Sequence, residues 1–399
     1  MNHKQLILFL FLGGVCSTSA QNTTNSPVSM FGIGDITTGE SGKYAGMGGV
    51  SIAMRSGNYL NMINPAGLTG VDSCRLVYEV GGMTAVKSYI QSGAKNTSVV
   101  GNVTNLALGC RVLPHWYMAL GVAPVSSVGY AVTMEQNVEG TDGSSLSSYF
   151  EGTGGLYRVN LGQAIKLGRF SLGANLSAIL GDITYSETQS GASITEESSM
   201  RAFYADFGMQ YTIPIRKYTN LCFGLVYGYH QKLYQDNEMT VSNTSSSSEI
   251  VEDVRFGKKY LPQYIGFGTT LDSRRWTVSA EYKYLQWDKM ESDYSTISYR
   301  NQHRASIGLE WLTGDIWRNP WHWMIGANVG NSYVVIKHHN TINYSVTAGF
   351  GVPVMQGSTF SAGLRYDGQK AHSSLQRESS FSFYINLSFS EITNRSKIR

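Results

Sequence analysis

The chain has 399 residues, of which 15% are charged and 12% aromatic, and it contains 44 Gly, 25 Tyr and 8 Pro. The charged fraction is well below the roughly 25% usual for soluble globular proteins, yet the mean hydropathy is −0.16. The sustained apolar run from Leu6 to Val15 is shorter than the about 20 residues that a membrane-spanning helix needs. A helical membrane protein is therefore excluded, and a net charge of only +3 gives no support to nucleic-acid binding. The composition favours an outer-membrane β-barrel over the alternative, a secreted soluble β-protein.

The N-terminus predicts export from the cytoplasm. Lys4 precedes the apolar run, and the small residues Thr18, Ser19 and Ala20 precede Gln21. We therefore expect residues 1–20 to be a secretory signal peptide. Cys16 does not make it a lipoprotein signal, because the residues before it lack the required pattern.

Three cysteines remain after removal of this signal, which is too few for a disulfide scaffold. Cys74 and Cys110 are equidistant from residue 92, the middle of a predicted hairpin loop, so they could face each other. Two unlinked side chains are favoured over a disulfide.

Fourteen segments within residues 75–390 alternate apolar and polar residues with a period of two, beginning near Leu76 and ending near Phe389. This period sends the two sets of side chains to opposite faces of a strand, and an even strand number suits a bacterial single-chain barrel. The connections also alternate: Gly168-Arg169 and residues 272–275 are short, whereas residues 127–149 and 235–259 are long and polar. Short periplasmic turns and long extracellular loops are typical of outer-membrane barrels.

Tryptophans support the same orientation, because most of them fall near the short-turn rim and Trp287 falls near the other rim, as interfacial girdles do. The prediction is an all-β, 14-stranded antiparallel transmembrane barrel in the cell outer membrane, with both termini periplasmic and a tail at residues 391–399.

Charged residues of the strands lie opposite the apolar sets. A charge on the lipid side would cost roughly 2 to 4 kcal/mol, so the charged face is expected to line the lumen. The predicted lumenal charges are Arg75, Glu79, Arg158, Asp206, Glu281, Lys283, Arg304, Glu310, Arg365 and Asp367. Mixed signs suit ion pairs and hydrogen bonds to something packed inside.

Residues 21–74 lack convincing strand alternation and are too apolar for a disordered tail. Gly46, Gly48 and Gly49 do not form a nucleotide-binding loop, since no strand precedes them and no Lys-Ser/Thr follows. The apolar and turn-forming residues of this segment include Met47, Ile52, Met54, Tyr59, Leu60, Met62, Ile63, Asn64 and Pro65.

A family resemblance rests on the motif at residues 45–53, on Asn64-Pro65-Ala66-Gly67-Leu68 and on the fourteen strands that follow. Together they resemble the FadL-type outer-membrane transporters of long-chain fatty acids, in a Bacteroidetes-like branch suggested by residues 26–35. The resemblance implies that residues 21–74 form a hatch that plugs the lumen and that the residues from Met47 to Pro65 named above line the substrate path. It also implies passive uptake of hydrophobic small molecules. The partners expected are therefore membrane lipid and a hydrophobic substrate, with no nucleic acid.

Pro124 stands in the third predicted strand, where it has no N–H to donate to the ladder. Ala123 and Pro124 are the candidate lateral gate, because FadL-type transporters, which the chain resembles, bend this strand to open the wall. The alternative is a proline at the extracellular rim. A gap would expose Met47, Met54 and Tyr59, so cysteines at Ala123 and Met54 should crosslink.

The sequence gives little support for an enzymatic or metal-dependent function. No nucleophile motif accompanies the histidines, and His338-His339 would point to opposite faces of a strand. We expect no catalytic residue, no metal site and no cofactor. The alternative to transport is an accessory barrel that docks other outer-membrane proteins in an assembly or secretion complex; a stoichiometric partner in mild detergent would favour it.

Overall fold

The structure is a computed structural model that describes residues 26–37, 39–91, 94–137, 145–243, 246–253, 257–292, 294–315, 319–355, 357–372 and 375–392. The expected signal peptide, the start of the N-terminal segment and most of the expected tail lie outside this part of the chain. In the described residues no helix is long and apolar enough to cross a membrane.

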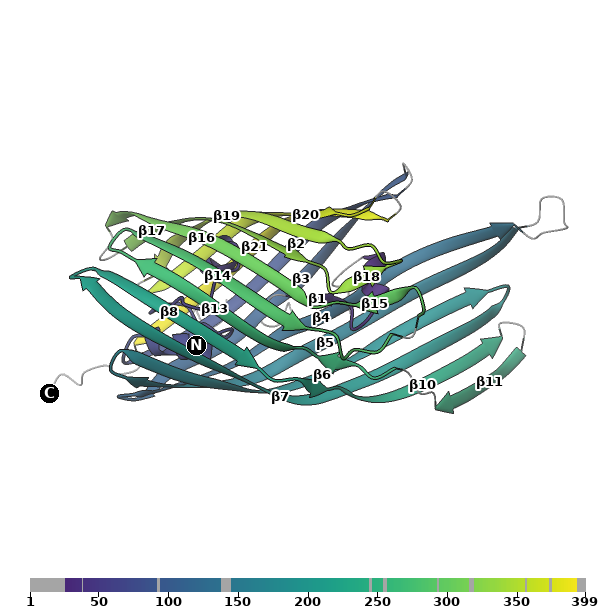
Figure 1. Ribbon diagram of the computed structural model, residues 1–399, viewed down its shortest axis with the longest axis horizontal. Helices are drawn as coiled ribbons and strands as arrows, with labels where there is room; N and C mark the ends of the chain where they lie inside the picture. Colours follow the sequence, from purple (N-terminus) through teal and green to yellow (C-terminus); the bar gives the residue numbers. More distant parts are fainter. Residues whose placement is uncertain are drawn as a thin grey trace, which may run out of the picture.

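Fourteen antiparallel strands form a closed barrel, as the sequence predicts (Figure 1). Each strand pairs with its sequence neighbour in the barrel, and β21 pairs with β2 to close the wall. The barrel strands are β2 (Arg75–Gln91), β3 (Ala94–Leu113), β4 (Trp116–Asn137), β5 (Ser145–Leu167), β6 (Phe170–Gln189), β7 (Ala192–Arg216), β8 (Thr219–Gly228), β13 (Gln263–Asp272), β14 (Trp276–Gln286), β16 (Gln302–Asp315), β17 (Asn319–Asn331), β19 (Ile342–Met355), β20 (Ser358–Lys370) and β21 (Arg377–Ile392).

Several segments expected to be long loops are continuations of strands. β4 and β5 run on to Asn137 and Ser145, and β6 and β7 meet at residues 189–192. β10 (Tyr234–Asn243) pairs with the first half of β7, and β11 (Ser246–Asp253) pairs with β10. These six strands project beyond the rest of the barrel at the right of Figure 1. Polar residues continue the strands here because the ladder beyond the membrane needs no apolar face.

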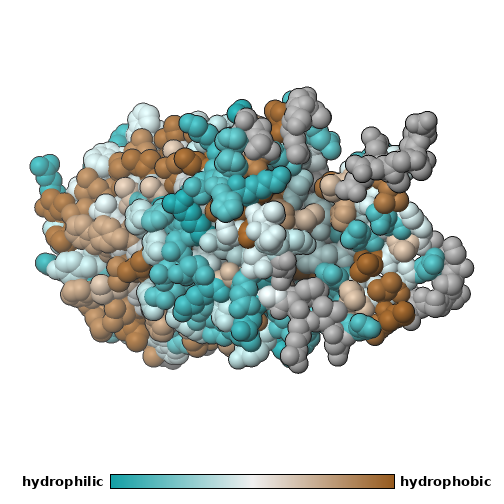
Figure 2. All heavy atoms as spheres, turned by 45° about the vertical axis from the view of Figure 1, so that its right-hand side comes forward, coloured by the Kyte–Doolittle hydropathy of each residue, from teal (hydrophilic) through white to brown (hydrophobic). Residues whose placement is uncertain are grey.

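The outer face of the barrel carries the predicted apolar side chains. Phe207, Ile325 and Phe381 are each about half exposed, as are their counterparts on most strands. Figure 2 shows hydrophobic residues gathered over its left part and hydrophilic residues across its middle. Trp276, Trp311 and Trp323 are successive cross-strand neighbours near the short-turn rim, which is the geometry of an interfacial aromatic girdle.

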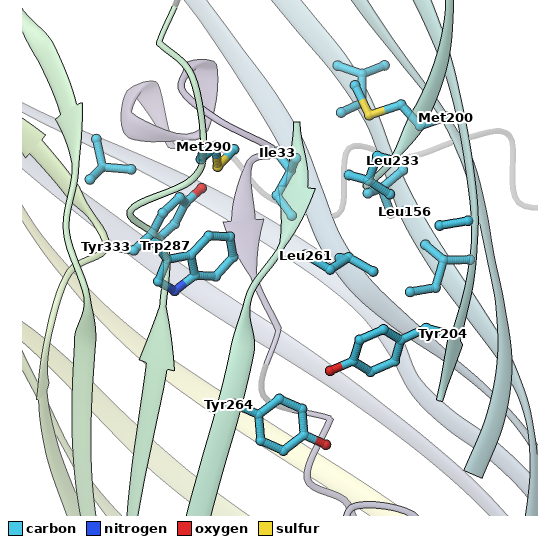
Figure 3. Packing of buried hydrophobic residues seen from close by; sticks show 14 of the residues in the cluster. Ile33, Leu156, Met200, Tyr204, Leu233, Leu261, Tyr264, Trp287, Met290 and Tyr333 are labelled. Carbon is cyan, nitrogen blue, oxygen red and sulfur yellow. The ribbon is translucent and has the colours of Figure 1, made fainter. Parts of the chain in front are cut away.

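Trp287 does not belong to a girdle, contrary to expectation. It is 2% exposed and its ring stacks on Tyr333 with centroids 4.4 Å apart. Both residues belong to an apolar cluster with Met290, Leu261 and Ile33 at the rim opposite the short turns (Figure 3). Two small sheets lie in the connections of this region, β9 (Gln231–Lys232) with β12 (Tyr260–Leu261) and β15 (Ile297–Tyr299) with β18 (Val334–Ile336).

The N-terminal segment contains only short elements, namely η1 (Pro27–Met30), β1 (Asp35–Ile36), α2 (Gly42–Gly46) and η2 (Pro65–Gly70). Most of its apolar side chains are fully buried, including Met47, Ile52 and Leu68. Its connection to the barrel at Cys74 has a positive φ of 57°. Cys74, Cys110 and Cys222 are free thiols, as favoured above.

Candidate functional site

Charged side chains of the barrel wall hold the N-terminal segment. Lys43 of α2 forms an ion pair of 3.2 Å with Glu310 of β16, and His322 of β17 approaches the same carboxylate at 2.7 Å. Both Lys43 and Glu310 are buried. A buried carboxylate is costly unless cations and hydrogen bonds surround it, so this contact fixes the position of α2.

Two further carboxylates accept backbone N–H groups of the segment. Glu79 accepts from Leu60 at 2.7 Å, and Glu281 accepts from Ser51 and Ile52 at 2.7 and 2.9 Å. Backbone groups with no partner in a helix or sheet would be costly when buried. The wall therefore supplies partners for a segment that has little secondary structure of its own.

The remaining predicted charges divide into two groups. Arg304 and Arg365 both approach Glu40 of the segment, at 2.9 and 3.9 Å, and Arg75 approaches Asp72 at 3.7 Å. The others interact mainly within the wall. Arg158 pairs with Asp206 at 3.2 Å, Lys283 lies over the Tyr264 ring at 4.1 Å, and Asp367 pairs with Arg365 at 2.7 Å.

Asn61 and Asn64 tie the segment to itself. Asn61 Nδ2 donates to the carbonyls of Ser51 and Met54, and Asn64 Nδ2 donates to that of Ile52 at 2.6 Å. Asn64 Oδ1 also accepts from Ala66 N at the start of η2, where Pro65 needs no partner. The side-chain hydrogen bonds of Asn61 and Asn64 thus fix the path of the chain between Ser51 and Ala66.

Inward-facing glycines let the segment lie directly on the wall. A Cβ at Gly208 would come within 1.9 Å of Asn64 Oδ1, and one at Gly326 within 2.1 Å of the Met47 carbonyl carbon. Gly48 has a φ of 74° and turns the chain above β16 and β17. These positions in the strands are a signal that sequence reasoning missed.

Tyr44 and Tyr59 of the N-terminal segment are buried against the barrel wall. Burial raises the pKa of both phenols above the usual value, and the carboxylates of Glu79 and Glu310 add to the shift. Tyr59 bonds to Ser361 of β20 at 2.8 Å. Both tyrosines are therefore neutral packing residues.

Strands β3 and β4 separate partway along their length. They pair only from Leu113↔Trp116 to Leu106↔Val122. Beyond that point, residues 94–105 of β3 pair with β2 alone, and β4 continues on β5 with a register shift between Pro124 and Ser126. Pro124 thus lies at a bulge where the wall divides, and not at the start of a loop.

A strap formed by residues 26–37 replaces β3 along part of the vacated edge of β4. Strand β1 pairs with Ser126 and Ser127, Thr37 N donates to Val125 O at 2.9 Å, and Ser26 N donates to Gly129 O at 2.7 Å. The strap was not predicted, because a two-residue strand leaves no periodicity in the sequence.

The strap also reaches the other side of the separation and the apolar cluster. Asp35 forms an ion pair of 3.2 Å with Lys87 of β2, and Ser26 Oγ lies 2.5 Å from Glu378 of β21. The Tyr333 hydroxyl donates to Gly34 O at 2.6 Å. The strap therefore connects β4, β2 and the cluster at the rim.

A cavity of about 140 Å³ lies where the two strands part. Leu60, Met62 and Ile63 of the segment line it together with Ala123 and Pro124 of β4. Met47, Met54 and Tyr59 lie elsewhere, in a cluster with Tyr44 and Met324. The residues expected beside a gap are thus placed against β17 and β20 instead.

A larger cavity of about 460 Å³ lies inside the barrel between the strap and the wall. Its lining includes Lys87, Glu281, Lys283, Arg304 and Arg365. Ile52 and Ile63 belong to this lining too, and Ile63 and Lys283 line both cavities. In the described residues no group of three or more His, Cys, Asp or Glu side chains is placed to hold a metal ion.

The overall fold is similar to that of several solved structures. The Pseudomonas putida toluene transporter TodX is 16% identical, with a TM-score of 0.62 over 90% of this chain and 100% of that one. A Pseudomonas aeruginosa FadL homologue is 12% identical, with a TM-score of 0.60 over 91% and 100%. The Ralstonia pickettii toluene transporter TbuX is 14% identical, with a TM-score of 0.58 over 88% and 98%.

At these identities the likeness is one of fold. No protein with a curated description matches the sequence. A family model described as BamG matches residues 1–395, so the chain belongs to the BamG family. The resemblance to FadL-type proteins is thus confirmed at the level of architecture, whereas the family carries a different name.

Proposed function

We propose that the protein is an outer-membrane channel for passive uptake of fatty-acid-like hydrophobic small molecules, with residues 21–74 as its hatch. The apolar outer face and the tryptophan girdle support a membrane location. The fold is similar to that of channels described as toluene transporters. In this proposal the short-turn rim is periplasmic, and the projecting strands are extracellular.

The observation that carries the lateral exit is the early end of the β3–β4 ladder at Leu106↔Val122. A barrel that only lined water would gain stability by pairing these strands throughout. The cavity beside Ala123 and Pro124 is the route by which a hydrophobic molecule leaves the lumen for the bilayer. Leu60, Met62 and Ile63 form its inner side, and the strap is the movable part of the hatch.

The test bridges Ile63 and Ala123, replaced by cysteines in a background without Cys74, Cys110 and Cys222, with a bifunctional thiol reagent. We expect uptake of toluene or a labelled fatty acid to fall by at least about tenfold, while barrel assembly is unchanged. The basis is that both positions line the same cavity. Full uptake in the bridged protein would reject the lateral route.

The matched control bridges Thr69 and Ser171, whose hydroxyls lie 2.8 Å apart and tie η2 to β6 away from this cavity. The T69C/S171C pair holds the hatch equally firmly but leaves the route open. We expect its uptake to equal that of the unbridged protein.

A further inference from the structure

The strands that project beyond the barrel have no role in the proposed transport. We define the wing as β10, β11 and residues 128–137, 145–155, 181–189 and 192–201 of β4 to β7. In the described part of the chain, β11 pairs only with β10, so its other edge leaves backbone N–H and C=O groups without a strand partner. Native proteins normally shield such an edge, because it is a template for another strand.

A row of apolar side chains extends across the wing to the unpaired edge of β11. Ile194 of β7, Val241 of β10 and Ile250 of β11 are direct register partners on one face. Ile250 is 59% exposed, and Val251 on the other face is 56% exposed. The edge strand β11 contains neither lysine nor proline, and its charged residues, Glu249, Glu252 and Asp253, are all acidic. Such an edge opposes pairing with a second acidic strand but not with a basic one.

The charge of the wing is almost entirely negative. Its residues include eleven Asp or Glu and a single basic residue, Arg201, which pairs with Asp236 at 3.0 Å. Glu197 and Glu238 are direct register partners and both exposed. Like charges directly opposite each other destabilise a sheet, and the negative potential of the wing favours a cationic partner.

We propose that the wing is a docking surface for an extended basic segment of another protein, which adds to the sheet along β11. Main-chain hydrogen bonds to the free edge give the affinity, as in other strand additions. Apolar side chains of the partner lie beside Val251 on one face of β11, and its Lys or Arg side chains lie beside Glu252 and Ile250 on the other face. An anionic lipid surface is disfavoured by the same charges.

The test measures binding of a labelled ten-residue peptide of alternating Val and Lys to the full-length protein in nonionic detergent. We expect saturable binding that weakens at higher salt, since exposed charges are screened. A peptide of alternating Val and Glu should not bind. Immobilised anionic lipid should not retain the protein in the absence of peptide, and retention that E252K or V251S abolishes would favour a lipid ligand and overturn the proposal.

Two variants locate the site. The reversal E252K, on the edge strand itself, should weaken binding of the Val-Lys peptide severalfold, and V251S should weaken it to a similar extent. The control E291K removes an exposed carboxylate outside the wing and should leave binding unchanged. Binding of the Val-Lys peptide to E252K as tight as to the unchanged protein, or equal binding of a proline-interrupted Val-Lys peptide, would overturn the proposal. The peptide-binding assay does not measure uptake, so its result is independent of whether the proposed channel function is correct.

Discussion

At the scale of single residues, the inward charges were predictable whereas their partners were not. Glu310 and Arg304 stand opposite apolar positions, and the cost of charge in lipid assigns them to the lumen. Their partners Lys43 and Glu40 lie more than 260 residues away in the sequence. No local pattern records such a pairing, since it depends on how the segment is threaded through the closed barrel.

Lys43→Met should destabilise the barrel by roughly 3 to 5 kcal/mol, because it leaves the buried Glu310 carboxylate with His322 alone. Lys43→Arg should restore most of the loss. The measurement is the temperature at which the barrel loses its compact mobility in detergent gels.

The control for this prediction is Lys258→Ala, which removes an exposed pair with Glu291 at 3.8 Å. Exposed pairs contribute about 0 to 1 kcal/mol, so its transition should barely move. A Lys43→Met protein as stable as the control would show that the buried pair contributes nothing.

At the scale of elements, the fourteen strands were predictable because lipid enforces alternation along every one of them. Strand ends were not, since the ladder of β4 with β5 continues for many residues beyond the apolar belt. The N-terminal segment, the proposed hatch, was recognisable only as a segment without alternation. The path of this segment depends on glycines of the wall such as Gly208 and Gly326. The strand register predicts that these glycines face inward, but it does not predict which residues of the segment they contact.

Deleting residues 22–60 should raise permeability to small hydrophilic solutes, because α2, β1 and their packed neighbours leave the lumen. The carboxylates Glu281 and Glu310 would then face water. Influx of a labelled sugar into intact cells measures this effect, with heat-modifiable mobility as the control for assembly. Unchanged influx would mean that the apolar cluster around Trp287 seals the barrel without the hatch.

At the scale of the whole molecule, the barrel has two unlike ends. One end consists of short turns beside a tryptophan girdle, and the other is closed by the cluster around Trp287 and Tyr333 and extended by the wing. The strap joins these parts, since it contacts Tyr333, β4 and β2. Strand β4 belongs both to the wing and to the site where β3 and β4 separate. A partner bound to the wing and a substrate in the lumen would therefore both contact regions next to this strand.

This polarity supports the proposed orientation in the membrane, which can be tested in intact cells. Protease added from outside should cut the β10–β11 region, between residues 235 and 259, since the wing projects from the extracellular rim in our proposal. The turn at residues 272–275, which joins β13 and β14 on the opposite rim, should be cut only after the cells are opened. Protease sites engineered into both segments allow the two to be compared in one background, with mass spectrometry of the fragments as the readout. Cleavage at residues 272–275 in intact cells would invert the orientation and place the wing, with any partner it binds, in the periplasm.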